Sequence, residues 1–221
     1  GRYPAGRDPA ARIGASIMGV RRPGLVFIHS AGAGGASRPA APTFPGFLAW
    51  FFAHEAGHLY QRHRSARYEE GDSWIHEGGA DALAYFALSD LNATSPDYLP
   101  QRLSKTLDAC ATALGDGPLF EARERDAFQA YYDCGVFLHL AAASSVARAG
   151  DADYFDLWLA FLADVRGGAP WNGETFARRV AAMGDAGTAT FIERVAYERL
   201  KDPRTTLTEG LAASGFAWSD D

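Results

Sequence analysis

The chain has 221 residues, 48% of them hydrophobic, which is enough to fill the core of a substantial globular domain. The formal net charge is −6, so the sequence lacks the excess of basic residues that nucleic-acid-binding proteins use, and we expect no nucleic-acid partner. No apolar segment approaches the roughly 20 residues that a membrane-spanning helix requires, and we therefore expect no membrane span.

Residues 1–42 are rich in Gly, Ala, Pro and Arg and contain one strand candidate at residues 24–29. This strand is short, which is typical of the edge of a sheet, and a Gly/Ala-rich loop follows it. Because an extended peptide can pair with an exposed backbone edge, the backbone of Gly32, Ala33 and Gly34 is a candidate substrate edge. The segment predicts a small β element that forms one structural unit with the rest of the chain.

From residue 43 onward the apolar residues recur with a helical period of about 3.6. In the first predicted helix, residues 43–64, the apolar positions are Phe47, Leu48, Phe51, Phe52, Leu59 and Tyr60. A second helix is expected to begin after Asp72 or Ser73, either of which is a good N-cap, and to end near residue 91. Further helices are predicted over residues 99–114, 126–149, 154–165, 175–183 and 189–200. The fold class is therefore mainly α, with residues 43–221 as a helical domain.

The first helix contains an H-E-x-x-H sequence at residues 54–58. Residues four apart lie on nearly the same face of a helix, so the imidazoles of His54 and His58 can converge on one tetrahedral Zn²⁺. Glu55 lies one residue round from His54, within reach of a water at the metal. Its carboxylate is therefore the candidate general base, which would take a proton from that water and pass it to the leaving amine.

Glu77, on the second predicted helix, is the candidate third ligand. Eighteen residues, 59–76, separate it from His58. Three protein ligands leave the fourth zinc position open for water and then substrate, as catalytic sites require and closed structural sites do not. Burying His54, Glu55, His58 and Glu77 together without a metal would cost several kcal/mol. The sequence therefore predicts one catalytic Zn²⁺.

This combination resembles the gluzincin zinc metallopeptidases, in which H-E-x-x-H is followed by a glutamate ligand on the next helix. The spacing and the aromatic-x-x-Glu-Gly pattern at residues 74–78 are most similar to the catalytic domain of the glycyl aminopeptidase family. The likeness covers roughly residues 25–216, with specific motifs only at 54–81 and 131–135, and a closing helical segment at 207–216. It implies a zincin-type helical catalytic domain.

The resemblance also suggests roles for two further residues. Asp81, one turn after the third ligand, resembles the aspartate of thermolysin-like enzymes that holds a ligand histidine, and His54 is the favoured partner. The Tyr-x-x-Gly segment at 132–135 resembles the helix whose tyrosine donates a hydrogen bond to the oxyanion. Tyr132 is the match and Tyr131 the alternative, because neighbouring residues point about 100° apart.

The sequence departs from the aminopeptidase pattern in residues 28–35, which contain no acidic residue where relatives anchor the substrate amine with a glutamate. Cleavage at a chain end and within a chain therefore both remain open. Among the other histidines, His76 is interpreted as a partner of a ligand, a pocket-wall residue or a surface residue, and His63 as a solvated one. His29 is either an ordinary residue or part of the substrate edge, and His139 is either a core or a pocket residue. Cys110 and Cys134 could form one disulfide, but an isolated pair makes no disulfide framework, and buried small hydrophobic residues are the favoured interpretation.

The sequence thus predicts a zinc-dependent peptidase that hydrolyses a peptide or protein substrate. Two alternatives remain: a zinc-stabilised binding domain without catalysis, and a zinc hydrolase acting on a non-peptide substrate, since metal chemistry does not fix the leaving group. Side-chain specificity and oligomeric state are left open. A periplasmic or secreted location is slightly favoured over the cytoplasm.

Overall fold

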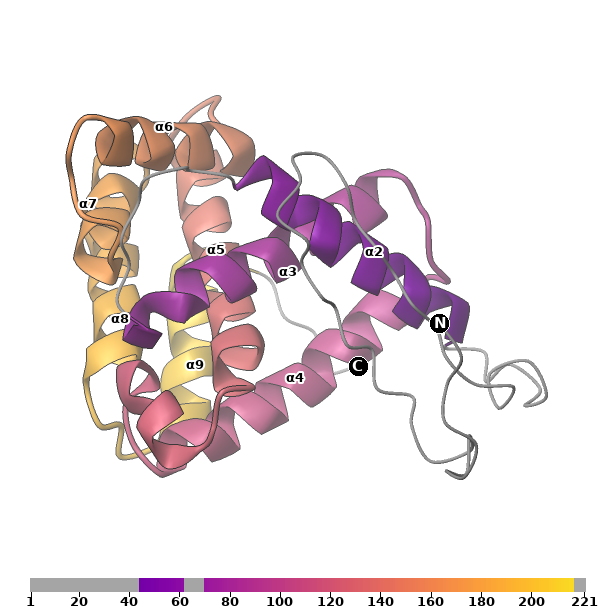
Figure 1. Cartoon of the computed structure of the whole chain (residues 1–221), viewed down its shortest axis with the longest axis horizontal. Coiled ribbons are helices and arrows are strands. Elements are labelled where there is room, and N and C mark those ends of the chain that lie inside the picture. The colour runs from indigo at the N-terminus through magenta and orange to yellow at the C-terminus, as the bar shows by residue number, and fades with distance from the viewer. Residues whose placement is uncertain (1–43, 62–69, 217–221) are drawn as a thin grey trace, which may run out of the picture.

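A computed structural model describes residues 44–61 and 70–216, and the secondary structure within these ranges is helical (Figure 1). The α-helices are α2 (Phe44–Tyr60), α3 (Ser73–Asp90), α4 (Tyr98–Gly115), α5 (Ala130–Ala149), α6 (Tyr154–Arg166), α7 (Gly173–Met183), α8 (Ala186–Tyr197) and α9 (Pro203–Ala213). Short 3₁₀ turns lie at η2 (Glu70–Asp72), η3 (Leu119–Glu121) and η4 (Arg123–Arg125). The prediction of a mainly α fold is confirmed. The strand at 24–29 lies outside the described residues.

Three helices begin three or four residues from the predicted position, and each of these differences has a local cause. α5 begins at Ala130 instead of 126, because Asp126 adopts a left-handed backbone conformation (φ 56°) that a helix cannot include. α8 begins three residues before the predicted 189, because the side chain of Asp185 accepts the Thr188 N–H and caps the helix there. α9, expected only over 207–216, begins at Pro203, a residue that suits the first turn.

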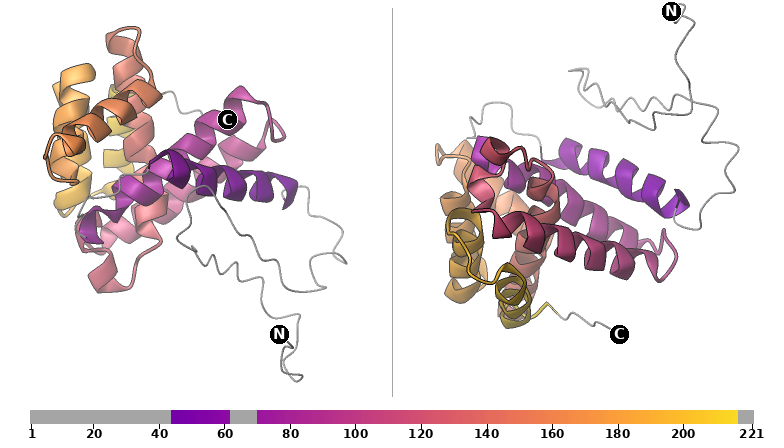
Figure 2. Two further views of the ribbon diagram at one scale, coloured as in Figure 1. Left: turned by 45° about the horizontal axis from the view of Figure 1, so that its top comes forward. Right: turned by 90° about the horizontal axis from the view of Figure 1, so that it is seen from below.

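α3 lies between α2 and α5 and packs against both (Figures 1 and 2). On the far side of α5, helices α6 to α9 complete the body of the molecule. The core between these layers is aromatic: His139 of α5 is fully buried against Trp74, Trp158 and Phe176. Its Nδ1 lies 2.9 Å from the Tyr154 hydroxyl, so His139 is a core residue and not a pocket residue.

Two small residues set the crossing of α3 and α5. A Cβ atom added to Gly78 would lie 2.3 Å from the backbone of Gly135, and one added to Gly135 would lie 2.8 Å from the Gly78 Cα. Only glycine permits this approach. The crossing places Glu77, next to Gly78, beside the first turn of α5, which carries Tyr132. α2 approaches α3 in a similar way at Gly57, where an added Cβ would lie 3.1 Å from the Ala80 Cα.

The orientation of α2 differs from the apolar face that the sequence predicted. The buried positions on this helix are Gly46, Trp50, His54 and Gly57, with Gln61 directly after its end. Phe47 and Phe52 are 43% and 52% exposed, although the helical period of the apolar residues predicted that they lie in the core. The helix was correctly predicted, but its inner face carries the polar site residues, because the face that meets α3 is the one that holds His54 and His58.

Cys110 of α4 and Cys134 of α5 form a disulfide, and both are fully buried. The interpretation of these cysteines as separate buried thiols was therefore wrong. The bond closes a segment of 24 residues and joins α4 to the helix that carries Tyr132. Sequence alone could not show it, because the pairing depends on α4 and α5 lying side by side.

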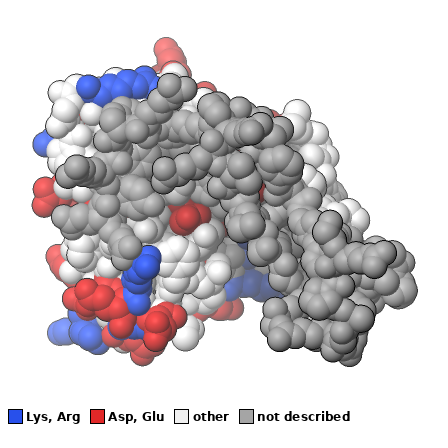
Figure 3. All heavy atoms as spheres, viewed as in Figure 1, with Lys and Arg blue, Asp and Glu red and all other residues white. Residues whose placement is uncertain are grey.

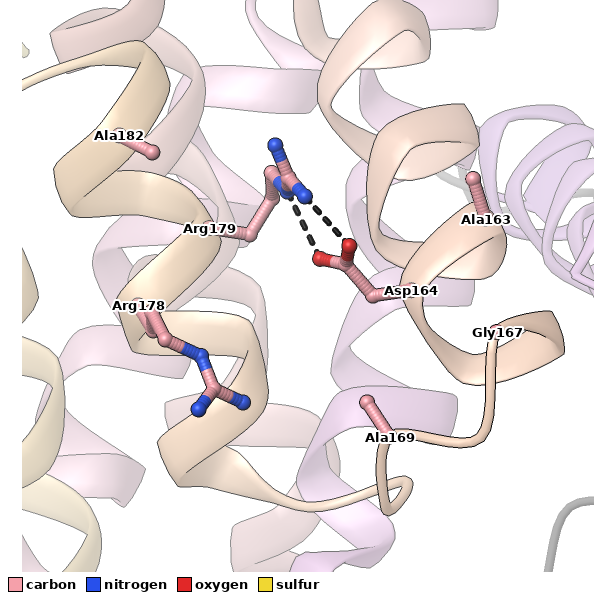
Figure 4. A pocket seen from close by; sticks show the side chains of 7 residues that line it. All are labelled: Ala163, Asp164, Gly167, Ala169, Arg178, Arg179 and Ala182. Atoms are coloured by element: carbon pink, nitrogen blue, oxygen red, sulfur yellow. Dashed lines mark hydrogen bonds and ion pairs between the residues drawn. The ribbon is translucent and has the colours of Figure 1, made fainter.

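On the face shown in Figure 3, the described residues carry charges of both signs. Between α6 and α7 lies an open pocket of about 410 Å³, lined by Arg178 and by the ion pair of Arg179 with Asp164 (Figure 4). Arg179 donates to both carboxylate oxygens of Asp164, a two-point contact that joins the two helices. Within the described ranges, every helix is too short or too polar to cross a membrane bilayer.

Candidate metal centre

The ligand atoms of His54, His58 and Glu77 come together where α2 packs on α3. The Nε2 atoms of His54 and His58 lie 3.6 Å and 3.3 Å from Oε2 of Glu77. All three candidate ligand atoms are within 4.8 Å of one another. His54 is buried, whereas His58 and Glu77 are half-buried. The structure thus brings together, from two helices, the three residues that the sequence predicted as ligands.

The other ring nitrogen of each histidine is held by a separate partner. His54 Nδ1 donates to Oδ1 of Asp81 at 2.8 Å, and His58 Nδ1 donates to Oε1 of Gln61 at 3.0 Å. Gln61 is itself fixed, because its Nε2 donates to the backbone carbonyl of His76 at 2.9 Å. With each Nδ1 held as a donor, the neutral form of each imidazole has its Nε2 lone pair on the side of Glu77, as metal ligation requires.

Glu77 provides the test of whether a cation fits here. Its Oε2 is buried and accepts no hydrogen bond of normal geometry, although it faces two imidazole nitrogens. A buried carboxylate oxygen without a partner is costly, and a cation between the three ligand atoms would satisfy it. Two imidazole nitrogens and one carboxylate oxygen are also a common ligand set for catalytic zinc. The residues therefore fit a metal cation.

The charges of the cluster shift the pKa values of His54 and Glu77 in opposite directions. Burial by itself lowers the pKa of His54, but Asp81 and Glu77 outweigh it and raise that pKa to about 9. Burial raises the pKa of Glu77, but His54 and His58 lower it well below its usual range. The site therefore favours a negative Glu77 facing positive charge, which a bound dication would also supply.

Of the two candidate tyrosines, Tyr132 lies at the cluster and Tyr131 does not. The Tyr132 ring stacks on His54 with centroids 5.6 Å apart, whereas Tyr131 is fully buried and donates its hydroxyl to the Phe120 carbonyl. Burial, the charge of Glu77 and a hydrogen bond to Glu77 raise the pKa of Tyr132 well above its usual value, with a smaller contribution from Glu55. Tyr132 thus keeps its proton and lies at the cluster.

Glu55 is half-buried on α2, beside His54, and its charge is felt at the Tyr132 hydroxyl. His76 stacks on the ring of His58, with centroids 4.1 Å apart, and so forms part of the wall of the site. Gly32, Ala33 and Gly34, the candidate substrate edge, lie outside the described residues.

Sequence reasoning missed Gln61 and Trp50 as members of the site. Gln61 follows His58 by three residues, a spacing at which helix side chains meet, and this was the only signal available. The Nε1 of Trp50 donates to Oδ1 of Asp81 at 2.8 Å, a contact between residues 31 apart in sequence. That contact depends on how α2 packs against α3, and no local pattern encodes it.

Compared with family models, curated proteins and solved structures, the chain matches none. The function of this chain is therefore inferred from its own residues.

Proposed function

We propose that this chain is a zinc-dependent peptidase that binds one Zn²⁺ through His54, His58 and Glu77. The observation that carries the proposal is the convergence of two Nε2 atoms and a buried carboxylate oxygen within 4.8 Å, with both Nδ1 atoms held as donors. Three protein ligands leave a coordination position free, which supports a catalytic role over a closed structural one.

The composition of the ligand set favours zinc over harder cations. Mg²⁺ and Ca²⁺ are bound mainly by oxygen ligands, whereas two of the three ligands here are imidazoles. Imidazole also suits other transition metals, so the preference for zinc rests on its usual His₂Glu catalytic sites. The gluzincin resemblance of residues 54–81 supports the same choice.

When bound, Zn²⁺ polarises a substrate carbonyl and lowers the pKa of a water molecule. Glu55 takes a proton from the attacking water and then delivers it to the leaving nitrogen, which is the role its place beside His54 supports. Tyr132, whose pKa is raised by burial and by the negative charge of Glu77, keeps its proton and donates a hydrogen bond to the oxyanion of the substrate carbonyl. Asp81 and Gln61 hold the two imidazoles in place during these steps.

The disulfide between Cys110 and Cys134 supports a periplasmic or extracellular location, because such bonds persist in oxidising compartments. It lies two residues from Tyr132 in α5, so it also holds the helix of the oxyanion donor against α4. The substrate that we propose is a peptide or protein chain.

A panel of internally quenched peptides with free and with blocked N-termini tests the proposal. We expect cleavage that a chelator abolishes and added Zn²⁺ restores; the response to N-terminal blocking distinguishes exopeptidase from endopeptidase action. His58→Ala protein, purified in parallel, is the control for contaminating peptidases. Zinc binding without cleavage of any peptide would contradict the peptidase and favour a binding domain or another substrate class.

A further inference from the structure

Three side chains, His54 and Trp50 from α2 and Arg102 from α4, meet at Asp81 of α3, behind the proposed metal ligands. Asp81 is 4% exposed, and its Oδ1 accepts hydrogen bonds from His54 Nδ1 and Trp50 Nε1, each 2.8 Å long. Its other oxygen, Oδ2, lies 4.0 Å from a guanidinium nitrogen of Arg102 in α4. The same guanidinium lies over the indole ring of Trp50, 4.0 Å from the ring centroid.

The charge of Asp81 needs a partner of opposite sign. A buried carboxylate is costly unless charge and hydrogen bonds compensate it. His54 is neutral when its Nε2 ligates a metal, because its single ring proton is then on Nδ1. Among the contacts of Asp81 within the described residues, this leaves Arg102 as the cation, with Trp50 supplying a neutral donor.

Arg102 is held where this compensation requires it. Its side chain is 30% exposed, so one side of the guanidinium faces solvent while the other lies on Trp50. Burial raises the pKa of Tyr98, one turn earlier in α4, and the positive charge of Arg102 opposes that rise. Burial and the charge of Asp81 raise the pKa of Asp133 in α5 to about 6, while Arg102 opposes that rise. Arg102 therefore acts on acidic groups from two neighbouring helices.

We propose that Arg102 and Trp50 are positioning residues that act through Asp81 to hold His54 in the orientation and tautomer that bind the metal. Arg102 compensates the buried charge, and Trp50 fixes both the carboxylate and the guanidinium. This inference rests on the proposed metal site, and it adds a residue from α4, a helix that contributes no ligand. Loss of either side chain leaves Asp81 free to rotate away from His54, which weakens metal binding without removing a ligand.

The test is the Zn²⁺ dissociation constant, measured by competition with a chromophoric chelator, for Arg102→Gln and Trp50→Phe. We expect each to weaken zinc binding about tenfold, the lower end of the 10- to 100-fold loss seen when the partners of metal ligands are removed. Arg179→Gln is the matched control, because Arg179 is also 30% exposed and pairs with a carboxylate, Asp164, away from the metal (Figure 4). Its zinc affinity should equal that of the parent.

A double-mutant cycle with Asp81→Asn separates positioning from general destabilisation. If Arg102 acts through Asp81, Arg102→Gln should cause little further loss of zinc affinity once Asp81 is Asn. The melting temperature of each metal-free variant is recorded alongside, and Arg102→Lys is expected to restore part of the affinity by restoring charge. Unchanged zinc affinity in Arg102→Gln, or an equal further loss in the Asp81→Asn background, would overturn the inference. Absence of zinc binding by the parent chain would instead overturn the proposed metal site.

Discussion

Replacing Glu55 by Gln is expected to lower the rate of peptide hydrolysis about 10²- to 10⁴-fold, the usual contribution of a general acid–base group. The amide has nearly the same size as the carboxylate but cannot accept a proton from the attacking water. Glu55 is not among the three residues whose ligand atoms converge, so zinc affinity should stay at the parental value. Steady-state kinetics on a cleaved peptide, together with the metal content of the same sample, measures both quantities.

Glu193→Gln is the matched control for this change, because Glu193 is exposed on α8 and the substitution alters charge and shape in the same way. Its activity should be that of the parent. A Glu55→Gln protein that cleaves peptides at the parental rate would remove Glu55 from the role of base. Loss of zinc together with activity would instead make Glu55 part of the metal-binding set.

Replacing Gly78 by Ala is expected to destabilise the fold by about 3 kcal/mol, the upper end of the usual cost of overpacking. The added Cβ would lie 2.3 Å from the Cα and carbonyl carbon of Gly135 and 2.8 Å from the Val136 nitrogen. These are backbone atoms, so relief requires α3 and α5 to separate. For a chain of this length that cost lowers the melting temperature by roughly 6–12 °C. Thermal unfolding followed by circular dichroism measures the shift.

Gly115→Ala is the control for the intrinsic effect of the substitution. Gly115 ends α4, and no atom lies within 4 Å of an added Cβ there. This variant should be as stable as the parent or up to about 1 kcal/mol more stable, because alanine is the better helix former. Equal melting temperatures for Gly78→Ala and the parent would contradict the close crossing of α3 and α5.

The helices were predictable because their apolar periodicity is local information. The predictions that failed concern features that depend on the backbone conformation of a single residue or on packing between helices. The left-handed conformation of Asp126 makes α5 begin later than predicted, and the cap formed by Asp185 makes α8 begin earlier than predicted. The inner face of α2 was assigned to its phenylalanines, because periodicity shows that a helix has two faces but not which one meets α3.

The candidate site was predictable to the extent that its members share motifs. His54 and His58 are one helical turn apart, and Glu77 is near enough in sequence to be sought on the next helix. The groups that hold them were not predictable in the same way. The contacts of Trp50 with Asp81, of Gln61 with the His76 carbonyl and of Arg102 with Trp50 exist only after α2, α3 and α4 have packed. Trp50 and Arg102 carry no sequence signal for such a role, and the only signal for Gln61 is its spacing of three residues from His58.

The central claim, a zinc site formed by His54, His58 and Glu77, is tested most directly by titrating the metal-free protein with Zn²⁺. We predict one equivalent bound per chain. Glu77→Ala should weaken binding by at least about 100-fold, more than removal of a partner of a ligand typically does. Failure of the parent to bind one equivalent, or a Glu77→Ala protein that binds zinc as tightly as the parent, would contradict the claim.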